Sequence, residues 1–148
     1  MIPADPQFDA RVRANFDKQI IMATLGITLK DVTPGGVVLE MPFRDDLIQQ
    51  HGFIHAGIIT TALDSACGYA AFSLMPPEAE VLTVEFKSNF LRPAAGERFR
   101  FEGKVLKPGK TLMVTEGSAF AVTAAGEKLI SSMQATMMVI TGRDGINA

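Results

Sequence analysis

Hydrophobic and polar residues follow a helical pattern at the start of the chain. An apolar stripe at helical spacing runs through residues 9–25 and consists of Val12, Phe16, Ile20, Ile21 and Leu25. Gly26, directly after it, is a typical helix stop. The pattern predicts one N-terminal helix within residues 1–25 that covers part of the remaining fold.

The pattern then changes to short segments with strand character. Residues 27–30 (Ile-Thr-Leu-Lys) have strand character, residues 37–41 are mainly apolar, and the turn-forming sequence Thr33-Pro34-Gly35-Gly36 lies between them. They predict a strand, a turn and a second strand. A polar loop follows, which contains Arg44, Asp45 and Asp46.

A long apolar stretch occupies the middle of the chain, from Gly52 to Met75, and ends at Pro76 and Pro77. It is about long enough to cross a bilayer. Asp64 lies at its centre, however, and a carboxylate in the middle of a membrane is costly. The alternating segments downstream also need an apolar element to cover, so we predict a buried core helix rather than a membrane helix.

Four segments after the prolines have strand character, namely residues 81–91, 98–107, 111–122 and 128–140. Short links rich in turn-forming residues separate them, which favours antiparallel neighbours. In the second segment, apolar or small residues alternate with charged ones, as expected for a sheet with one face on a core: Phe99, Phe101, Gly103 and Val105 against Arg98, Arg100, Glu102 and Lys104. We predict an α+β fold with an antiparallel sheet wrapped around the helix through Asp64.

Composition adds limits on the class of protein. A chain of 148 residues is expected to form one domain, with residues 141–148 as a frayed tail. Hydrophobic residues make up 47% and charged residues 20%, and the mean hydropathy of +0.21 argues against general disorder and points to a buried subunit interface. The net charge of -2 gives no electrostatic footprint for nucleic acid, which is not expected as a partner.

Cysteine content and the first residues bear on the compartment. Cys67 is the only cysteine, which excludes an intrachain disulfide and fits a reducing cytoplasm. Residues 1–17 mix acids, bases and two prolines without a continuous apolar run, unlike a secretory signal. We therefore expect a cytoplasmic protein.

Asp64 is the most informative residue because small and apolar residues surround it in the predicted helix. An unpaired buried carboxylate is expensive, so its presence implies either a compensating partner or a catalytic role. Neighbouring hydroxyls are the alternative partners, from Thr60, Thr61 or Ser65.

The entrance to this helix is the second candidate site. Ala56 and Gly57 follow His55, and their backbone amides would point out of the positive helix end, where a carbonyl oxygen that gains negative charge is stabilised. Close packing is the alternative role for the two small residues, and a capping or core role is the alternative for His55.

The spacing of the two candidate sites has a consequence. Ala56 and Asp64 are eight residues apart, which is about 12 Å along one straight helix. One subunit cannot aim both at one carbonyl group. If both act on the same substrate, Asp64 must come from the helix of a second chain.

Other chemistries have weaker support. His51 and His55 have the spacing of a helical zinc pair, but no glutamate lies between them and no third ligand is evident, so no metal site is expected. The nucleophile elbow of serine hydrolases is missing. Cys67 is better explained by packing than by nucleophilic chemistry.

Three blocks of sequence together resemble a known family. The first is Gln49-x-x-Gly52-x-x-His55-Ala56-Gly57, with Asp64 nine residues after the histidine. The second runs from Thr83-Val84-Glu85-Phe86 to Asn89-Phe90-Leu91-Arg92-Pro93, and the third is Lys107-Pro108-Gly109-Lys110-Thr111. Over residues 26–140 the chain resembles the hotdog-fold acyl-CoA thioesterases, specifically the phenylacetate-pathway (PaaI-like) group.

The resemblance implies a role for each matching residue. It makes Asp64 the nucleophile or the general base, and Thr83 a hydroxyl residue that places water near it. It makes Gln49 the side chain that orients water or thioester, His55 the histidine of the helix entrance, and the amide of Ala56, beside Gly57, the oxyanion donor. Family members commonly have Asn where Gln49 stands and Gly where Ala56 stands; both exchanges keep the required group.

The resemblance also implies the partners. The substrate is an acyl-CoA. Arg92, Lys107 and Lys110 lie on predicted turns where they would meet its phosphates, and a solvated basic turn is the alternative role for each. No metal or redox cofactor is required, and coenzyme A is part of the substrate. The active site lies at the interface of a dimer, and two dimers are expected to form a tetramer.

Two rival functions exist within the same fold. Hotdog dehydratases and hydratases carry a His-x-Phe-Pro or hydratase-type signature, which is missing here. A non-catalytic module that binds acyl-CoA or acyl carrier protein is the second rival, and the combination of Gln49, His55 and Asp64 argues against it. The acyl group and the choice between direct attack and general-base catalysis stay open.

Overall fold

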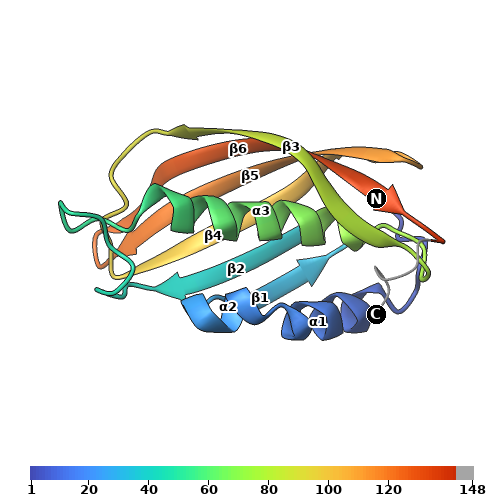
Figure 1. Ribbon diagram of the computed structural model, residues 1–148, viewed down its shortest axis with the longest axis horizontal. Helices are drawn as coiled ribbons and strands as arrows, with labels where there is room; N and C mark the ends of the chain where they lie inside the picture. The colour runs from blue at the N-terminus through green and yellow to red at the C-terminus, as the bar shows by residue number, and fades with distance from the viewer. Residues whose placement is uncertain (143–148) are drawn as a thin grey trace.

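A six-stranded antiparallel sheet wraps around one long helix in the computed structural model, which describes residues 1–142 (Figure 1). The strand order is β1-β2-β4-β5-β6-β3. The elements, in chain order, are α1 (Phe8–Lys18), α2 (Ile20–Leu25), β1 (Thr28–Thr33), β2 (Gly36–Pro42), α3 (Ala56–Phe72), β3 (Glu80–Phe90), β4 (Arg98–Lys107), β5 (Leu112–Thr123) and β6 (Gly126–Ile140). This confirms the predicted α+β architecture. The frayed tail expected at residues 141–148 falls almost entirely outside the described residues.

One predicted neighbour relation is wrong. The short link between β3 and β4 was expected to join antiparallel neighbours, but β3 pairs with β6 and forms an edge of the sheet. Residues 91–97 instead cross the end of the sheet from its edge to β4. A link of this length is long enough to pass over the two strands between them, because an extended residue spans about 3.3 Å and neighbouring strands lie about 4.8 Å apart.

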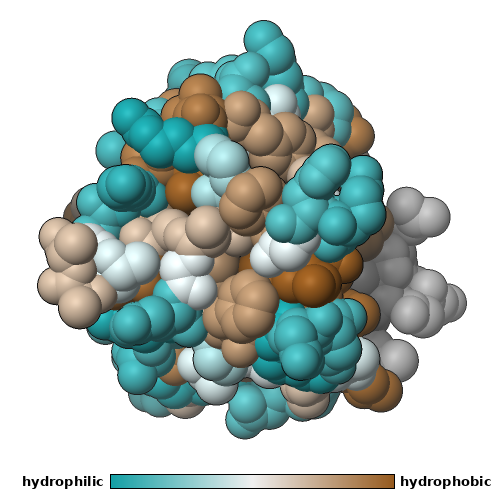
Figure 2. All heavy atoms as spheres, turned by 90° about the vertical axis from the view of Figure 1, so that its left-hand side faces the viewer, coloured by the Kyte–Doolittle hydropathy of each residue, from teal (hydrophilic) through white to brown (hydrophobic). Residues whose placement is uncertain are grey.

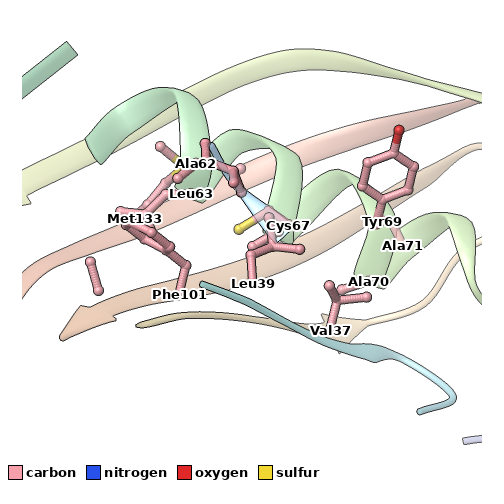
Figure 3. Packing of buried hydrophobic residues seen from close by; sticks show 14 of the residues in the cluster. Val37, Leu39, Ala62, Leu63, Cys67, Tyr69, Ala70, Ala71, Phe101 and Met133 are labelled. Atoms are coloured by element: carbon pink, nitrogen blue, oxygen red, sulfur yellow. The ribbon is translucent and has the colours of Figure 1, made fainter. Parts of the chain in front are cut away.

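Two glycines allow α3 to lie close to the sheet. Gly103 on β4 pairs with Gly117 on β5, and both face the helix. A side-chain carbon on Gly103 would lie 2.2 Å from the carbonyl oxygen of Ala66, and one on Gly117 would lie 3.0 Å from Sγ of Cys67. Only glycine permits this close approach of backbones. Figure 3 shows the surrounding core, in which Cys67 and Leu63 of α3 lie near Leu39 and Phe101 of the strands.

The predicted alternation along β4 is confirmed. Phe99, Phe101, Gly103 and Val105 are buried, whereas the charged residues between them face outward and remain half-buried or exposed. The inward residues pack against α3, which therefore supplies the apolar cover that the sheet needs.

The N-terminal helix differs from its prediction, because it consists of two helices. The chain breaks at Gln19, whose backbone is extended (ψ 93°). This break changes the helical phase, so that Ile20 (78% exposed) and Ile21 (46% exposed) point away from the core and Met22 is buried in their place, while Leu25 is buried as predicted. The predicted stop is confirmed, since Gly26 ends α2 with a left-handed backbone (φ 74°).

Arg11 of α1 holds the C-terminal end of α3. Its guanidinium donates to the backbone carbonyls of Phe72, Met75 and Pro76 at 2.8, 2.9 and 2.6 Å. It also lies 4.4 Å from the centre of the Phe72 ring and 3.5 Å from a carboxylate oxygen of Asp5. A cation at this end adds hydrogen bonds to carbonyls beyond the last full turn of the helix and complements the helix dipole. Among residues 1–142, no helix has both the length and the apolar character needed to cross a membrane.

Candidate active site

Asp64 lies in the middle of α3 and has one hydrogen-bond partner from the sheet edge. The hydroxyl of Thr83, near the start of β3, donates to Oδ1 of Asp64 at 2.8 Å. The neighbouring hydroxyls are engaged elsewhere: Thr60 and Thr61 donate to backbone carbonyls one helical turn back, and Ser65 donates to Oε1 of Gln19. Burial raises the pKa of Asp64 above its ordinary value, and the hydrogen bond from Thr83 partly opposes this effect.

A small polar pocket of about 140 Å³ lies beside this carboxylate. Its other polar lining comes from Ser65 and from four residues that the sequence did not indicate, namely Asn15, Gln19, Tyr69 and Glu80. Asn15 and Gln19 belong to the N-terminal helical segment, and their spacing of four residues places them on one face of a helix. That spacing is the signal that could have suggested them, but nothing in the sequence connects it to Asp64.

The entrance of α3 contains His55 as its capping residue. Nδ1 of His55 accepts a hydrogen bond from the backbone amide of Gly57 at 2.8 Å. The ring proton of the neutral imidazole therefore lies on Nε2, which is left to donate. A side-chain carbon on residue 57 would lie 3.0 Å from Nδ1, so glycine gives the imidazole its space.

The two backbone amides of this entrance differ. The Gly57 amide is used by His55, so it does not point freely outward as the sequence suggested. The amide of Ala56 has no acceptor within the described part of the chain, and Ala56 is exposed. One unsatisfied donor therefore points out of the positive end of a helix of 17 residues.

Gln49 lies in the loop before α3, and its side-chain oxygen binds the backbone of that loop. Oε1 accepts from the backbone amides of His51 (2.6 Å) and Phe53 (3.3 Å), which closes the turn. The side-chain nitrogen Nε2 remains as a donor. Gln49 thus presents an N–H group in a position that the loop backbone determines.

A pocket of about 500 Å³ opens at this entrance. It is lined by Gln49, His55 and Ala56 from the entrance, by residues 90–94 at and after the end of β3, and by Ile130 and Ser131 of β6, among others. Figure 2 faces this end of the molecule, where apolar residues lie between polar ones. Arg92 lines the same pocket, and its guanidinium donates to the Leu129 carbonyl at 2.7 Å.

The residues proposed from the sequence thus fall into separate groups within one chain. Gln49, His55, Ala56 and Arg92 line the entrance pocket, with Gly57 next to them, whereas Asp64 and Thr83 line the smaller pocket. Lys107 and Lys110 line neither; they lie at the turn between β4 and β5. Because α3 is one continuous helix, Ala56 and Asp64 remain about 12 Å apart along it.

Two alternative chemistries lack the required arrangement. His55 caps α3 while His51 lies in the preceding turn, so the two do not form a helical metal pair. No group of three or more His, Cys, Asp or Glu residues suited to a metal ion occurs among residues 1–142. Cys67 is buried, and this burial raises the pKa of its thiol to about 12, which keeps it protonated and unreactive.

Comparison with known proteins identifies the family of this chain. The model of the thioesterase superfamily matches residues 51–125. A crystal structure of a thioesterase family protein from Silicibacter pomeroyi is 55% identical, with a TM-score of 0.90, and the match covers 91% of this chain and 99% of that one.

Two further proteins are more distant. Acyl-coenzyme A thioesterase 13 of Homo sapiens is 32% identical over 92 residues, which cover 60% of this chain and 64% of that one. The E. coli PaaI protein from the phenylacetic acid degradation operon is 21% identical and shares the fold, with a TM-score of 0.82 over 94% of this chain and 97% of that one. The chain belongs to the thioesterase superfamily, with the hotdog fold and the thioester-hydrolase chemistry of that family.

Proposed function

We propose that the protein is an acyl-CoA thioesterase that works as a homodimer, in which Asp64 of one subunit and the α3 entrance of the other act on one thioester. The observation that carries this proposal is the division of the site within one chain. The carboxylate and the Ala56 amide line different pockets, about 12 Å apart along one helix. Hydrolysis needs an attacking group and an oxyanion donor at the same carbonyl group, so a second subunit must supply the missing half.

The reaction uses Asp64 in its ionised form. Either an oxygen of Asp64 attacks the carbonyl carbon, the C–S bond breaks and water hydrolyses the resulting anhydride, or Asp64 takes a proton from a water that attacks the carbonyl carbon directly. Both routes release a carboxylic acid and coenzyme A. Thr83 supports the ionised carboxylate by its hydrogen bond. Protein groups, substrate and water suffice, and the proposed reaction includes no metal or redox cofactor.

The entrance of the opposite subunit stabilises the negative charge on the carbonyl oxygen. The amide of Ala56 is the primary donor, because it has no acceptor within residues 1–142 and lies at the positive end of α3. Nε2 of His55 and Nε2 of Gln49 are further donors on the same pocket. They orient the thioester or the attacking water.

Strand β3 supports association through the sheet edge. It is an edge strand of 11 residues, so one side of its backbone has no strand partner among the described residues. Large apolar side chains on and next to it are exposed: Leu82, Val84, Phe86, Phe90 and Leu91. A long apolar edge strand of this kind favours pairing with another chain. Because Thr83 lies on β3, such pairing places the Asp64 pocket next to the second subunit.

The basic residues fit coenzyme A once the two halves meet. Arg92 lies at the entrance pocket. Lys110 lies two residues before Leu112. In the sheet, Leu112 pairs with Met138, and Met138 pairs with Leu82, the residue before Thr83. Arg92 therefore belongs to the entrance half, whereas Lys107 and Lys110 belong to the Asp64 half, and in a dimer the phosphates of one coenzyme A would meet cations from both subunits. The similarity to a human acyl-coenzyme A thioesterase supports this substrate class.

The test is release of free coenzyme A from a panel of aryl, branched, short and medium acyl-CoAs. Wild-type protein is compared with Asp64→Asn, and Asp31→Asn serves as a matched control, because Asp31 is exposed on β1. We expect at least one acyl class to be hydrolysed, with a loss of at least about hundredfold in Asp64→Asn and little change in the control. Saturable binding of acyl-CoA without turnover would instead indicate the non-catalytic binding module.

A further inference from the structure

We infer that the pocket beside Asp64 selects acyl groups that carry a hydroxyl at their far end, and that Gln19 of the N-terminal segment is a residue that determines this specificity. This inference rests on the proposed thioesterase function and concerns which acyl group the same site prefers. Three observations support it: the open space beyond the carboxylate, the polarity of that space, and its position relative to the reacting carbon.

Open space continues from Asp64 along α3. Gly68 lies one helical turn further on the same helix face and lines the same pocket. Although Gly68 is buried, the place that a side chain would take there has no heavy atom within 4 Å. The helix therefore leaves room directly beyond the carboxylate, where the acyl part of a bound thioester would lie.

The side chains around this space form two short hydrogen-bonded chains. Ser65 donates to Oε1 of Gln19 at 2.8 Å, which fixes the amide and leaves its nitrogen Nε2 without an acceptor among residues 1–142. Tyr69 donates to Oδ1 of Asn15 at 3.0 Å, and Nδ2 of Asn15 donates to Glu80 at 3.4 Å. The pocket thus keeps donors on Gln19 and Asn15, and acceptors on Tyr69 and Glu80.

A hydroxyl group matches this set because it both accepts and donates a hydrogen bond. A methyl group of equal size would displace water from the amide and the carboxylate without replacing its hydrogen bonds, which is unfavourable. The distance also fits, because the helix advances about 6 Å from Asp64 to Gly68. A compact acyl chain with a terminal hydroxyl spans that distance from the carbonyl carbon.

The experiment compares two acyl-CoAs that differ only at the chain end, 6-hydroxyhexanoyl-CoA and heptanoyl-CoA. We expect the wild-type kcat/KM to favour the hydroxyl-terminated substrate by about tenfold or more, mainly through KM, because the contact is made before and during the reaction. Gln19→Leu should reduce this preference to near unity. The matched control is Gln7→Leu, an exposed glutamine on the same segment outside the pocket, which should keep the preference.

The outcome separates the inference from the proposed function. Hydrolysis of both substrates at equal kcat/KM would overturn the inference and leave the thioesterase function intact. If neither substrate is hydrolysed, calorimetry on the Asp64→Asn protein still tests the inference through its affinities for the two acyl-CoAs. A Kd about tenfold lower for the hydroxyl-terminated acyl-CoA, with this difference lost when Gln19→Leu is added, supports the inference. Equal Kd values contradict it.

Discussion

Thr83 donates a hydrogen bond to Asp64 across 2.8 Å, joining the edge strand β3 to the middle of α3. The carboxylate is buried deeply enough for its pKa to rise, and this hydrogen bond is the contact that opposes the rise. The balance of burial and this hydrogen bond therefore determines the pH at which Asp64 becomes protonated and loses its charge.

Replacing Thr83 by Val removes the donor while it keeps the size of the side chain. The pKa of Asp64 should rise further, because burial remains and the hydrogen bond to the ionised form is lost. Since the reaction needs the ionised carboxylate, the acid limb of the kcat/KM profile should move to higher pH, and activity below neutrality should fall about tenfold. Thr83→Ser keeps the hydroxyl and should keep the wild-type profile. A profile unchanged in Thr83→Val would show that the hydrogen bond does not influence the reaction.

The raised pKa of Asp64 also predicts an effect on stability. A carboxyl group whose pKa is higher in the folded state stabilises the fold below its unfolded pKa, about 3.9, and this contribution is lost as the pH rises through the folded value. At neutral pH the ionised Asp64 thus destabilises the fold, so Asp64→Asn should be more stable than wild type, by about 0.5–2 kcal/mol in the free energy of unfolding, and should unfold at a higher temperature. Thermal unfolding between pH 3 and pH 8 checks this. The difference should shrink towards acid pH, and a gap independent of pH would contradict the explanation.

The close contact of α3 with the sheet predicts a sharp difference between two glycines. In Gly103→Ala the new carbon would lie 2.2 Å from a backbone oxygen of α3, so helix and sheet must separate; we expect a loss of about 3 kcal/mol in the free energy of unfolding. Gly68→Ala makes the same exchange in open space within a helix and should raise stability by up to about 1 kcal/mol. Urea unfolding of both variants measures the two values, and similar effects at both positions would disprove the packing argument.

Arg11 and Arg13 provide a matched pair for the contact between the N-terminal segment and α3. Arg11→Met removes three hydrogen bonds at the end of α3, where the Phe72 and Pro76 carbonyls keep a backbone donor and the Met75 carbonyl does not. It also leaves the buried Asp5 carboxylate without its cation, so the variant should cost about 2–3 kcal/mol in the free energy of unfolding. Arg13→Met removes only an exposed ion pair with Asp9 and should cost less than about 0.5 kcal/mol. Equal losses in chemical denaturation would mean that the contacts of Arg11 contribute nothing beyond an ordinary surface charge.

The fold was more predictable than the site, for physical reasons. Burial leaves a direct trace in sequence, as in the alternation along β4 and the long apolar stretch that became α3. The break at Gln19 leaves none, because its extended backbone accompanies a side-chain contact with Ser65, a residue 46 positions away. The edge position of β3 likewise depends on pairing with β6, which local turn chemistry does not encode.

The candidate site shows the same distinction. Asp64 was recognisable because a carboxylate in an apolar helix is costly, and the entrance of α3 because small residues follow a histidine. The partner of Asp64 could not be derived from local sequence, since three nearby hydroxyls were equally suitable until Thr60, Thr61 and Ser65 proved to be bonded elsewhere. Thr83 was indicated only by the family resemblance. Asn15 and Gln19 reach the site by the fold of the N-terminal segment, outside the part of the chain that matches the family model.

The proposed sharing of one site between two subunits predicts rescue between two inactive variants. Ala56→Pro deletes the oxyanion donor at the first position of α3, where proline is compatible with a helix, and the backbone of His55 (φ -58°, ψ 136°) already suits a residue before proline. We expect it to fold normally and to lower kcat by about hundredfold. Mixing it with Asp64→Asn under conditions that exchange subunits should restore activity, because each mixed dimer has one site with both wild-type halves. About a quarter of all sites should then be active. Ala56→Ser, which keeps the amide, is the control for the position, and mixtures no more active than the two variants alone would show that Asp64 and Ala56 do not act across a subunit interface.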